Sequence, residues 1–194
     1  MTGRVLLAAA VLFLLAFLAS PDSFAWLFQP VTRNNAPAIY TQTSLLSLTL
    51  SHLVLVGLAV ASSTAVALVL AVLVTRPAGR EFLPLARTVT SVGQTFPPVA
   101  VLALAVPIMG FGAGPTLVAL FLYGLLPVFE NTLAGLTGQP PNVAEAARGM
   151  GLTPWQRLWQ VDLPLALPVI LTGMRLTAVI SLGTATIGST VAAR

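Results

Sequence analysis

One segment constrains the fold more than any other: Ser44 to Thr75 contains no Asp, Glu, Lys or Arg, and it stops at Arg76-Pro77. It has about 30 residues, whereas roughly 20 apolar residues suffice to cross the hydrocarbon core of a bilayer as an α-helix. We therefore expect a helix over 45–75 that tilts or begins outside the hydrocarbon core. Across the chain 57% of residues are apolar and 7% are charged, far from the roughly 25% charged residues of soluble domains. The sequence predicts an integral membrane protein.

The few charged residues exclude several functional classes. All nine basic residues are arginines, the net charge is +4, and no basic stripe of the kind that binds nucleic acid is present. Since the chain has no Cys and a single histidine, His52, we expect no disulfide, no metal site and no cofactor. The glycine-rich segment 110–114 lacks the Lys-Ser or Lys-Thr of a phosphate-binding loop, and no nucleophile and base are arranged for catalysis. We predict that the chain is not an enzyme and does not itself bind ATP.

Four more apolar segments predict transmembrane helices, which brings the expected number of spans to about five. They are 4–20, 88–109, 115–130 and 165–188. The first is short and follows Arg4, so it also has the length of the apolar part of a cleaved signal peptide. Because no clear small-x-small cleavage site precedes Ser20, we favour a retained first helix. We interpret the mixed stretch 22–43 as an exposed connector.

Basic residues indicate the orientation of the chain. Arg76, Arg80 and Arg87 lie in the connection between the second and third predicted spans, which the positive-inside rule places in the cytoplasm. Arg148 and Arg157 follow two spans later and therefore lie on the same side. We expect both connections to be cytoplasmic.

The third predicted span carries polar residues beside a break. Ser91 and Thr95 share one helical face, and Gln94 lies beside it. Pro97-Pro98 must interrupt the helical hydrogen bonds in mid-span, because proline has no backbone N–H. A broken span with polar side chains suits a gated pathway for a solute, and it suits a kinked structural helix equally well.

Two further sets of polar residues are candidates for the same pathway. Small and hydroxyl residues repeat at spacings of three and four along the last span, which is typical of close helix packing and also suits a pathway. These are Gly173, Thr177, Ser181, Thr184 and Gly188. His52, near the polar end of its span, either lines a pathway or sits at headgroup depth. The candidate pathway residues are His52, Ser91, Gln94, Thr95, Ser181 and Thr184.

The longest polar island in the chain lies between the fourth and fifth predicted spans and predicts two short helices joined by a sharp turn. Asn142 can cap a helix that has Glu145 at its third position. Thr153 can cap a second helix, which Pro154 opens and which has Gln156 at its third position. Gly151 between them stops the first helix.

Both of these helices have an apolar stripe at helical spacing. The stripes consist of Val143, Ala146, Ala147 and Met150 in the first helix and of Trp155, Leu158 and Trp159 in the second. Two amphipathic helices between segments too apolar for water indicate a docking element for a partner. An ordinary hairpin is the alternative.

The spacing within this island resembles a known motif, the EAA loop of ABC importer permeases. The matching residues are Glu145, Ala146, Ala147, Gly151, Val161, Leu163 and Pro164, with Val161 where Ile is commoner. The segments 94–98, 119–132 and 183–188 resemble the subfamily that imports osmoprotectant quaternary amines such as glycine betaine, choline and carnitine. The resemblance covers most of the chain from about Ser44 onward.

The resemblance implies an all-α, polytopic membrane helix bundle of the methionine-permease-like ABC importer type, with 1–194 as one permease domain. It implies that 138–164 is a cytoplasmic loop that couples the chain to an ATPase. The partners it implies are cytoplasmic ABC ATPase subunits, an extracytoplasmic substrate-binding protein, and a second permease copy or paralogue. Contact with that binding protein is the alternative to a plain connector for 22–43. The chain would be a multi-pass protein of the bacterial inner membrane, surrounded by the lipid bilayer.

The implied function is inward transport of quaternary-amine osmoprotectants by alternating access, driven by ATP hydrolysis on a separate chain. Two alternatives stay open: an ABC permease for another small solute such as an amino acid, and a non-conducting membrane scaffold that docks a cytoplasmic partner. Members of the resembled family usually continue through another span beyond the position of Arg194. We therefore expect either a short protein or a missing final span.

Overall fold

The computed structural model describes residues 2–32, 37–39 and 42–191, and all regular secondary structure in these ranges is helical. The all-α class predicted from the sequence is confirmed. Among these residues, three helices are long and apolar enough to cross a membrane, and the number rises to five if each of two bent helix pairs counts as one span. The chain divides into two compact units, Met1–Leu53 and Val54–Arg194.

The first unit is built around a sharp bend. Its helices are α1 (Thr2–Ala19) and α2 (Ala25–Phe28), the latter between short 3-10 turns at Pro21–Phe24 and Gln29–Val31. The chain turns by 115° after α1, where Pro21 cannot donate a backbone hydrogen bond to continue that helix. Phe24 packs edge-on against Phe13 and Phe17 of α1, with ring centroids 5.4 and 5.7 Å apart. These aromatic contacts fix the bend.

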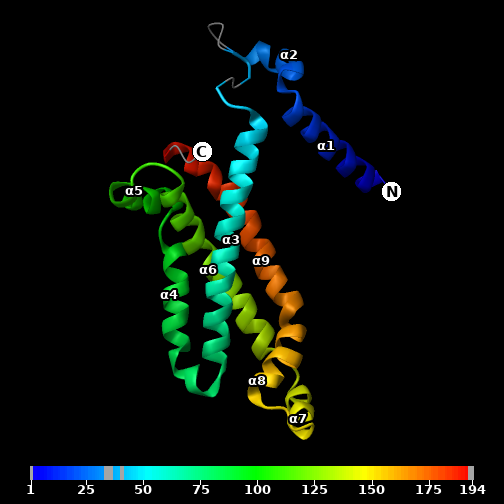
Figure 1. The fold of residues 1–194 in the computed structure, drawn as a ribbon, viewed down its shortest axis with the longest axis vertical. Coiled ribbons are helices and arrows are strands. Elements are labelled where there is room, and N and C mark those ends of the chain that lie inside the picture. Colours follow the sequence, from blue (N-terminus) through cyan, green and yellow to red (C-terminus); the bar gives the residue numbers. More distant parts are fainter. Residues whose placement is uncertain (1, 33–36, 40–41, 192–194) are drawn as a thin grey trace. The chain divides into compact units, whose positions relative to one another are not determined.

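The helices of the second unit follow one another with short connections (Figure 1). They are α3 (Leu45–Thr75, which begins in the first unit), α4 (Leu83–Thr95), α5 (Pro98–Met109), α6 (Ala113–Thr137), α7 (Pro141–Gly149), α8 (Pro154–Arg157) and α9 (Leu163–Ala185). Shorter 3-10 segments cover Pro77–Phe82 and Thr186–Val191, and a π-helical turn covers Leu158–Asp162.

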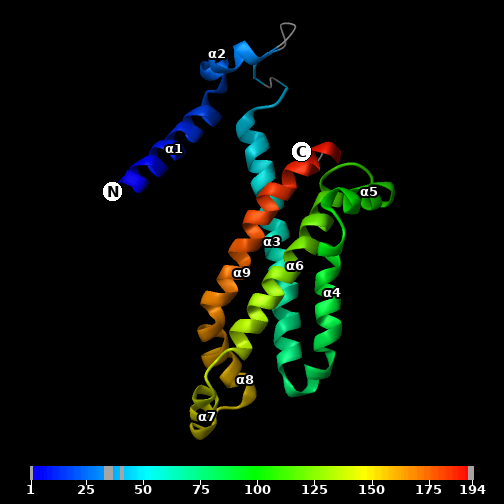
Figure 2. The same cartoon turned by 180° about the vertical axis from the view of Figure 1, so that it is seen from behind.

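The contact between α6 and α9 is the most extensive one in the second unit, and the two helices lie side by side in both Figure 1 and Figure 2. A Cβ on Gly173 of α9 would lie 2.8 Å from the carbonyl oxygen of Pro127. A Cβ on Gly124 of α6 would lie 2.5 Å from Ser63 Oγ and 2.8 Å from Thr177 Cγ2. Because only small residues allow backbones this close, Gly173 and Thr177 of the repeat on α9 serve helix packing.

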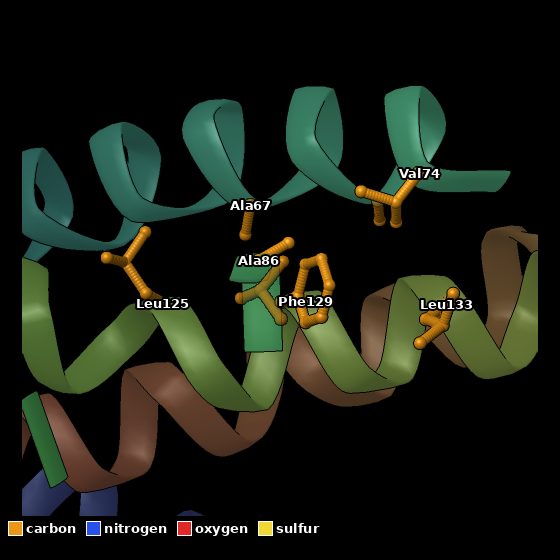
Figure 3. Close-up of a cluster of buried hydrophobic side chains, with 8 residues drawn as sticks. Ala67, Val74, Ala86, Leu125, Phe129 and Leu133 are labelled. Carbon is orange, nitrogen blue, oxygen red and sulfur yellow. The ribbon is translucent and has the colours of Figure 1, made fainter. Parts of the chain in front are cut away.

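A hydrophobic cluster joins α3, α4 and α6 (Figure 3). The fully buried ring of Phe129 on α6 shares this cluster with Ala67 of α3 and Ala86 of α4. Leu125 and Leu133 lie one turn before and after Phe129 and extend the cluster along α6. The two alanines let the helices approach, so α4 is held against α6 ahead of its break.

The expected break at Pro97-Pro98 is present and turns the chain by 92°. Phe96 and Pro97 both have extended backbone, with ψ of 144°. The α-region is disfavoured for a residue that precedes proline, and here both Phe96 and Pro97 precede a proline. The segment predicted as a span at 88–109 is therefore two helices at a steep angle, and the first begins earlier, at Leu83.

The helix end predicted at residue 130 is wrong, because α6 continues through Pro127 to Thr137. A proline inside a helix leaves the carbonyl four residues earlier, here that of Tyr123, without its usual donor. Gln94 Nε2 of α4 donates to this oxygen at 3.2 Å. The neighbouring helix thus supplies the missing hydrogen bond, and the fourth predicted span, 115–130, is part of a longer helix.

The last predicted span, 165–188, begins earlier than predicted, because α8, the π turn and α9 form one continuous helix, Pro154–Gly188. The π turn is closed by Leu163 N–H donating to Leu158 O and lies directly before Pro164. In a regular α-helix the ring of Pro164 would meet the carbonyl of Gln160. The wider π turn accommodates the proline.

Candidate functional site

The 138–164 loop lies between α6 and α9, at the end of the second unit that also carries the connection from α3 to α4 (Figures 1 and 2). Residues from both segments line one pocket at this end. The break between α4 and α5 lies away from this end, against Tyr123 in the middle of α6, and α5 lies beside residues 186–191. The two candidate regions of the second unit are therefore separate.

The predicted cap of the first loop helix is wrong. α7 begins at Pro141, Pro140 holds the N-cap position, and Asn142 lies inside the first turn. A proline at the first helical position has a suitable fixed φ, so the helix starts two residues earlier than the cap motif suggested. Glu145 is exposed and has no hydrogen-bond or ion-pair partner in the described part of the chain. It neither caps this helix nor pairs with an arginine among the described residues.

The turn and the second cap are confirmed. Gly151 has φ of +76°, a conformation that glycine adopts without strain. Leu152 N–H donates to Ala147 O at 3.1 Å and closes the end of α7. Thr153 Oγ1 accepts from Gln156 N–H, and Gln156 Oε1 accepts from Thr153 N–H at 2.8 Å, which forms the predicted capping box.

The two apolar stripes of the loop are only partly buried. Ala147 and Leu158 are each 1% exposed, and Leu158 packs in a cluster with Leu136 of α6 and Ala166 of α9. Met150, Trp155 and Trp159 are 70, 63 and 64% exposed. Ala146, the second small residue of the motif, is exposed as well. One side of the loop is fastened to the bundle and the other presents apolar side chains outward.

The last residues of the motif lie within the continuous helix. Val161, half-buried, belongs to the π turn. Leu163 packs against the cluster that contains Leu136 and Leu158, and Pro164 is exposed directly after the π turn. These residues thus shape the junction between the loop and α9.

Asp162 is a residue of this site that the sequence analysis missed. It is buried, and its carboxylate accepts from Arg157 Nε at 3.0 Å and from Arg76 Nη2 at 3.5 Å. Gln139 Nε2 donates to the Asp162 carbonyl oxygen at 2.8 Å. Residues 157 and 162 do not face each other in an α-helix, but the i to i+5 period of the π turn brings them together. The sequence does contain a signal for Asp162, because its carboxylate interrupts the apolar stretch that leads into α9.

Three pathway candidates lie on α4 just before its break. Ser91 Oγ donates to Thr88 O and Thr95 Oγ1 to Val92 O, so both hydroxyl groups bond within their own helix. Gln94 bonds to α6 as described above, and Tyr123 Oη of α6 donates to Phe96 O at the break. These contacts tie the break to α6, while Thr95 and Gln94 stay largely exposed.

The other pathway candidates lie elsewhere. Ser181 of α9 is buried with no partner for its Oγ in the described structure, and Thr184 is half-buried on the same face. No hydrogen bond among the described residues joins them to Ser91 or Thr95. His52 is half-buried in the first unit. The structure thus groups the α4 residues and the α9 residues separately.

Comparison with known proteins gives consistent matches. The model of the family described as "Binding-protein-dependent transport system inner membrane component" matches residues 63–194. The osmoprotectant import permease protein OsmY of Salmonella typhimurium is 46% identical over 74% of this chain and 61% of its own length. The carnitine transport permease protein OpuCB of Listeria monocytogenes is 40% identical over 77% of this chain and 68% of its own.

The choline transport system permease protein OpuBB of Bacillus subtilis is 41% identical over 52% of this chain and 46% of its own length. The chain thus spans about half to two thirds of the length of these relatives.

Proposed function

Because the chain belongs to the family of binding-protein-dependent transport system inner membrane components, we propose that it is a multi-pass permease subunit of an ABC importer for quaternary-amine osmoprotectants. The observation that carries the proposal is the 138–164 loop, a capped and sharply turned element that is fastened on one side and exposes Met150, Trp155 and Trp159 on the other. The substrate class is supported by relatives whose names specify osmoprotectant, carnitine or choline transport.

The exposed side of the loop is the surface on which an ABC ATPase docks. Ala146 is small enough to let α7 enter a groove, and Glu145, which has no partner in the described chain, is available for a basic residue of the ATPase. Trp155 and Trp159 supply exposed aromatic area of the kind that is enriched at protein interfaces. The ATP is hydrolysed on that partner, and this chain acts as a transport subunit rather than an enzyme.

The continuous helix explains how movement of the ATPase reaches the membrane. α8 passes through the π turn into α9 without a flexible joint, so a displacement of Trp155 moves α9 as well. Asp162 fastens the same junction to Arg76 at the end of α3. Coupling is then a rigid-body movement of helices, as in other domain rearrangements.

The pathway for the substrate includes Ser91 and Thr95 on α4, next to the break that Gln94 holds against α6. Broken helices at membrane depth are tolerated where they line a cavity, which favours this location. Ser181 and Thr184 come into contact with the substrate only if α6 and α9 separate during the transport cycle. His52 remains a further candidate.

The proposal also includes the remaining partners. An extracytoplasmic binding protein selects the substrate, and a second permease copy or paralogue completes the pathway. The arginine-bearing end of the second unit faces the cytoplasm, since positive residues are retained on that side.

Uptake by the reconstituted complex tests the function. The chain is placed in proteoliposomes with its ATPase and binding protein, and ATP-dependent uptake of labelled glycine betaine, choline and methionine is compared. We expect uptake of the quaternary amines only. Uptake of methionine alone would overturn the substrate class, and an ATPase that binds without any uptake would favour the scaffold.

Cysteine labelling tests the orientation, and the absence of native Cys keeps the background low. Met150→Cys and Phe111→Cys place a thiol at exposed positions, the first at the end of α7 and the second just before α6. We expect an impermeant maleimide to label Phe111→Cys in intact cells and Met150→Cys only after permeabilisation. The reverse pattern contradicts the docking proposal, because no cytoplasmic ATPase would reach the loop.

A further inference from the structure

A pocket of about 420 Å³ lies between the 138–164 loop and the connection from α3 to α4. Four arginines line it: Arg76 and Arg80 from the connection, Arg148 from α7 and Arg157 from α8. The only carboxylate among its lining residues is that of Asp162. The pocket is therefore strongly basic.

The positive charge of the pocket is only partly compensated. Asp162 pairs with Arg157 and Arg76 and holds both guanidinium groups in place. Arg80 and Arg148 have no hydrogen-bond or ion-pair partner in the described part of the chain. Two arginines are thus held by Asp162, and the other two are exposed and have no partner among the described residues.

The fixed arginines also keep unused donors. Each guanidinium carries five N–H groups, and Asp162 accepts from one of them on each side. Arg76 Nε is buried and has no partner in the described structure. A buried donor without an acceptor destabilises the folded state, so a ligand with several acceptor oxygens stabilises this site.

We propose that the pocket binds the phosphate group of an anionic ligand, either the headgroup of an anionic phospholipid or free phosphate. The planar guanidinium matches two phosphate oxygens at once, and such charge-assisted pairs are strong. Basic pockets beside the ends of transmembrane helices are typical binding places for anionic headgroups. A phosphate in this pocket bridges Arg80 and Arg148, so it holds α7 against the connection that follows α3. The site does not depend on which solute the protein transports.

Native mass spectrometry of the purified, delipidated full chain tests the proposal by titration with phosphatidylglycerol or phosphatidylethanolamine. We expect the wild type to prefer phosphatidylglycerol, and Arg80→Gln/Arg148→Gln to bind it roughly tenfold more weakly or worse, since two charge-assisted contacts are removed. The control Arg4→Gln/Arg175→Gln removes the same charge at two exposed positions outside the pocket and should keep the wild-type affinity.

The arms of the experiment separate the sources of phosphate. Competition by inorganic phosphate identifies free phosphate as a ligand, and binding of phosphatidylglycerol without such competition assigns the pocket to lipid. Equal affinity of the wild type for both lipids without phosphate binding overturns the proposal, as does an equal loss in the control variant.

An acidic segment of the ATPase is the rival occupant. If it occupies the pocket, Arg80→Gln/Arg148→Gln loses co-purification with the ATPase, and the wild type binds neither phosphatidylglycerol nor phosphate. This pair of results also overturns the proposal. The melting temperature without lipid checks that this variant is folded. If the variant is not folded, the titrations of the wild type with the two lipids and with phosphate test the proposal by themselves.

Discussion

Two neighbouring regions, helix α9 and the 138–164 loop that precedes it, both carry a stripe of residues at helical spacing, but the two stripes differ in burial. On α9 the small residues Gly173, Thr177 and Ser181 recur at helical spacing, and all three are buried. In the loop a stripe recurs at the same spacing, but Trp155 and Trp159 on it are mostly exposed.

The difference shows which surface each stripe packs against. The α9 stripe packs within the chain, because α6 approaches it closely. The loop stripes are buried at Ala147 and Leu158, whereas Met150, Trp155 and Trp159 are exposed, and we propose that these three form a surface for another chain. Substitutions in the first region should therefore reduce the stability of the fold, and those in the second should reduce assembly and transport.

The largest loss of stability is expected from Gly173→Ala on α9. The added Cβ would lie 2.8 Å from both Asn131 Cβ and Pro127 O of α6, so the two helices must move apart. We expect a loss of about 3 kcal/mol in the free energy of unfolding, at the upper end of overpacking effects. Gly149→Ala on α7 is the matched control, since nothing lies within 4 Å of its added Cβ. Equal melting temperatures for the two variants would contradict the packing role of this contact.

A smaller loss is expected from Asp162→Asn, at the base of the loop. Arg76 and Arg157 lose their shared counter-charge, and because their side chains are 25 and 30% exposed, water compensates in part. We expect a loss of roughly 2 kcal/mol, below the about 3–5 kcal/mol of a fully enclosed pair. Glu130→Gln, which breaks the exposed pair with Arg87, should cost less than about 1 kcal/mol. Denaturant titration in detergent measures both, and a larger effect of Glu130→Gln would show that burial does not set the order.

A change of Gly151 should separate stability from transport. Valine is strained at the positive φ of this position, which costs about 1–2 kcal/mol locally, whereas asparagine tolerates it. We expect Gly151→Val to insert into the membrane but to lose ATPase co-purification and uptake, and Gly151→Asn to keep most of both. Full uptake by Gly151→Val in proteoliposomes would mean that the angle between α7 and α8 does not matter for coupling.

Much of the fold was predictable because the bilayer selects long apolar helices. The bounds of α3 follow from an apolar run that ends at Arg76-Pro77, and the break after α4 follows from Pro97-Pro98. The course of α6 did not follow from local rules. The predicted span ended at residue 130, but α6 continues, and Gln94, 33 positions before Pro127, supplies a donor to the carbonyl that this proline leaves free. Such compensation depends on a neighbouring helix and is invisible to sequence periodicity.

The loop shows the same limit. Thr153, Pro154 and Gln156 predicted a cap correctly, because all its hydrogen bonds are local. The contacts of Asp162 depend on a π turn and on Arg76, which is distant in sequence, so no helical template predicted them. Which stripe residues stay exposed also required the structure, since periodicity alone does not tell a core from an interface.

The smallest effect on stability, and the clearest test of the comparison, is expected from Trp155→Ala/Trp159→Ala. Both side chains are mostly exposed, so their removal should change the free energy of unfolding by less than about 0.5 kcal/mol. If the stripe is the docking surface, the double variant should nevertheless lose most of its ATPase co-purification, because exposed aromatic residues at an interface commonly dominate binding. Phe111→Ala removes an even more exposed aromatic ring just before α6 and should leave co-purification unchanged. A double variant that unfolds more easily yet still binds the ATPase would place the tryptophans with the residues of α9, as part of the fold and not of the interface.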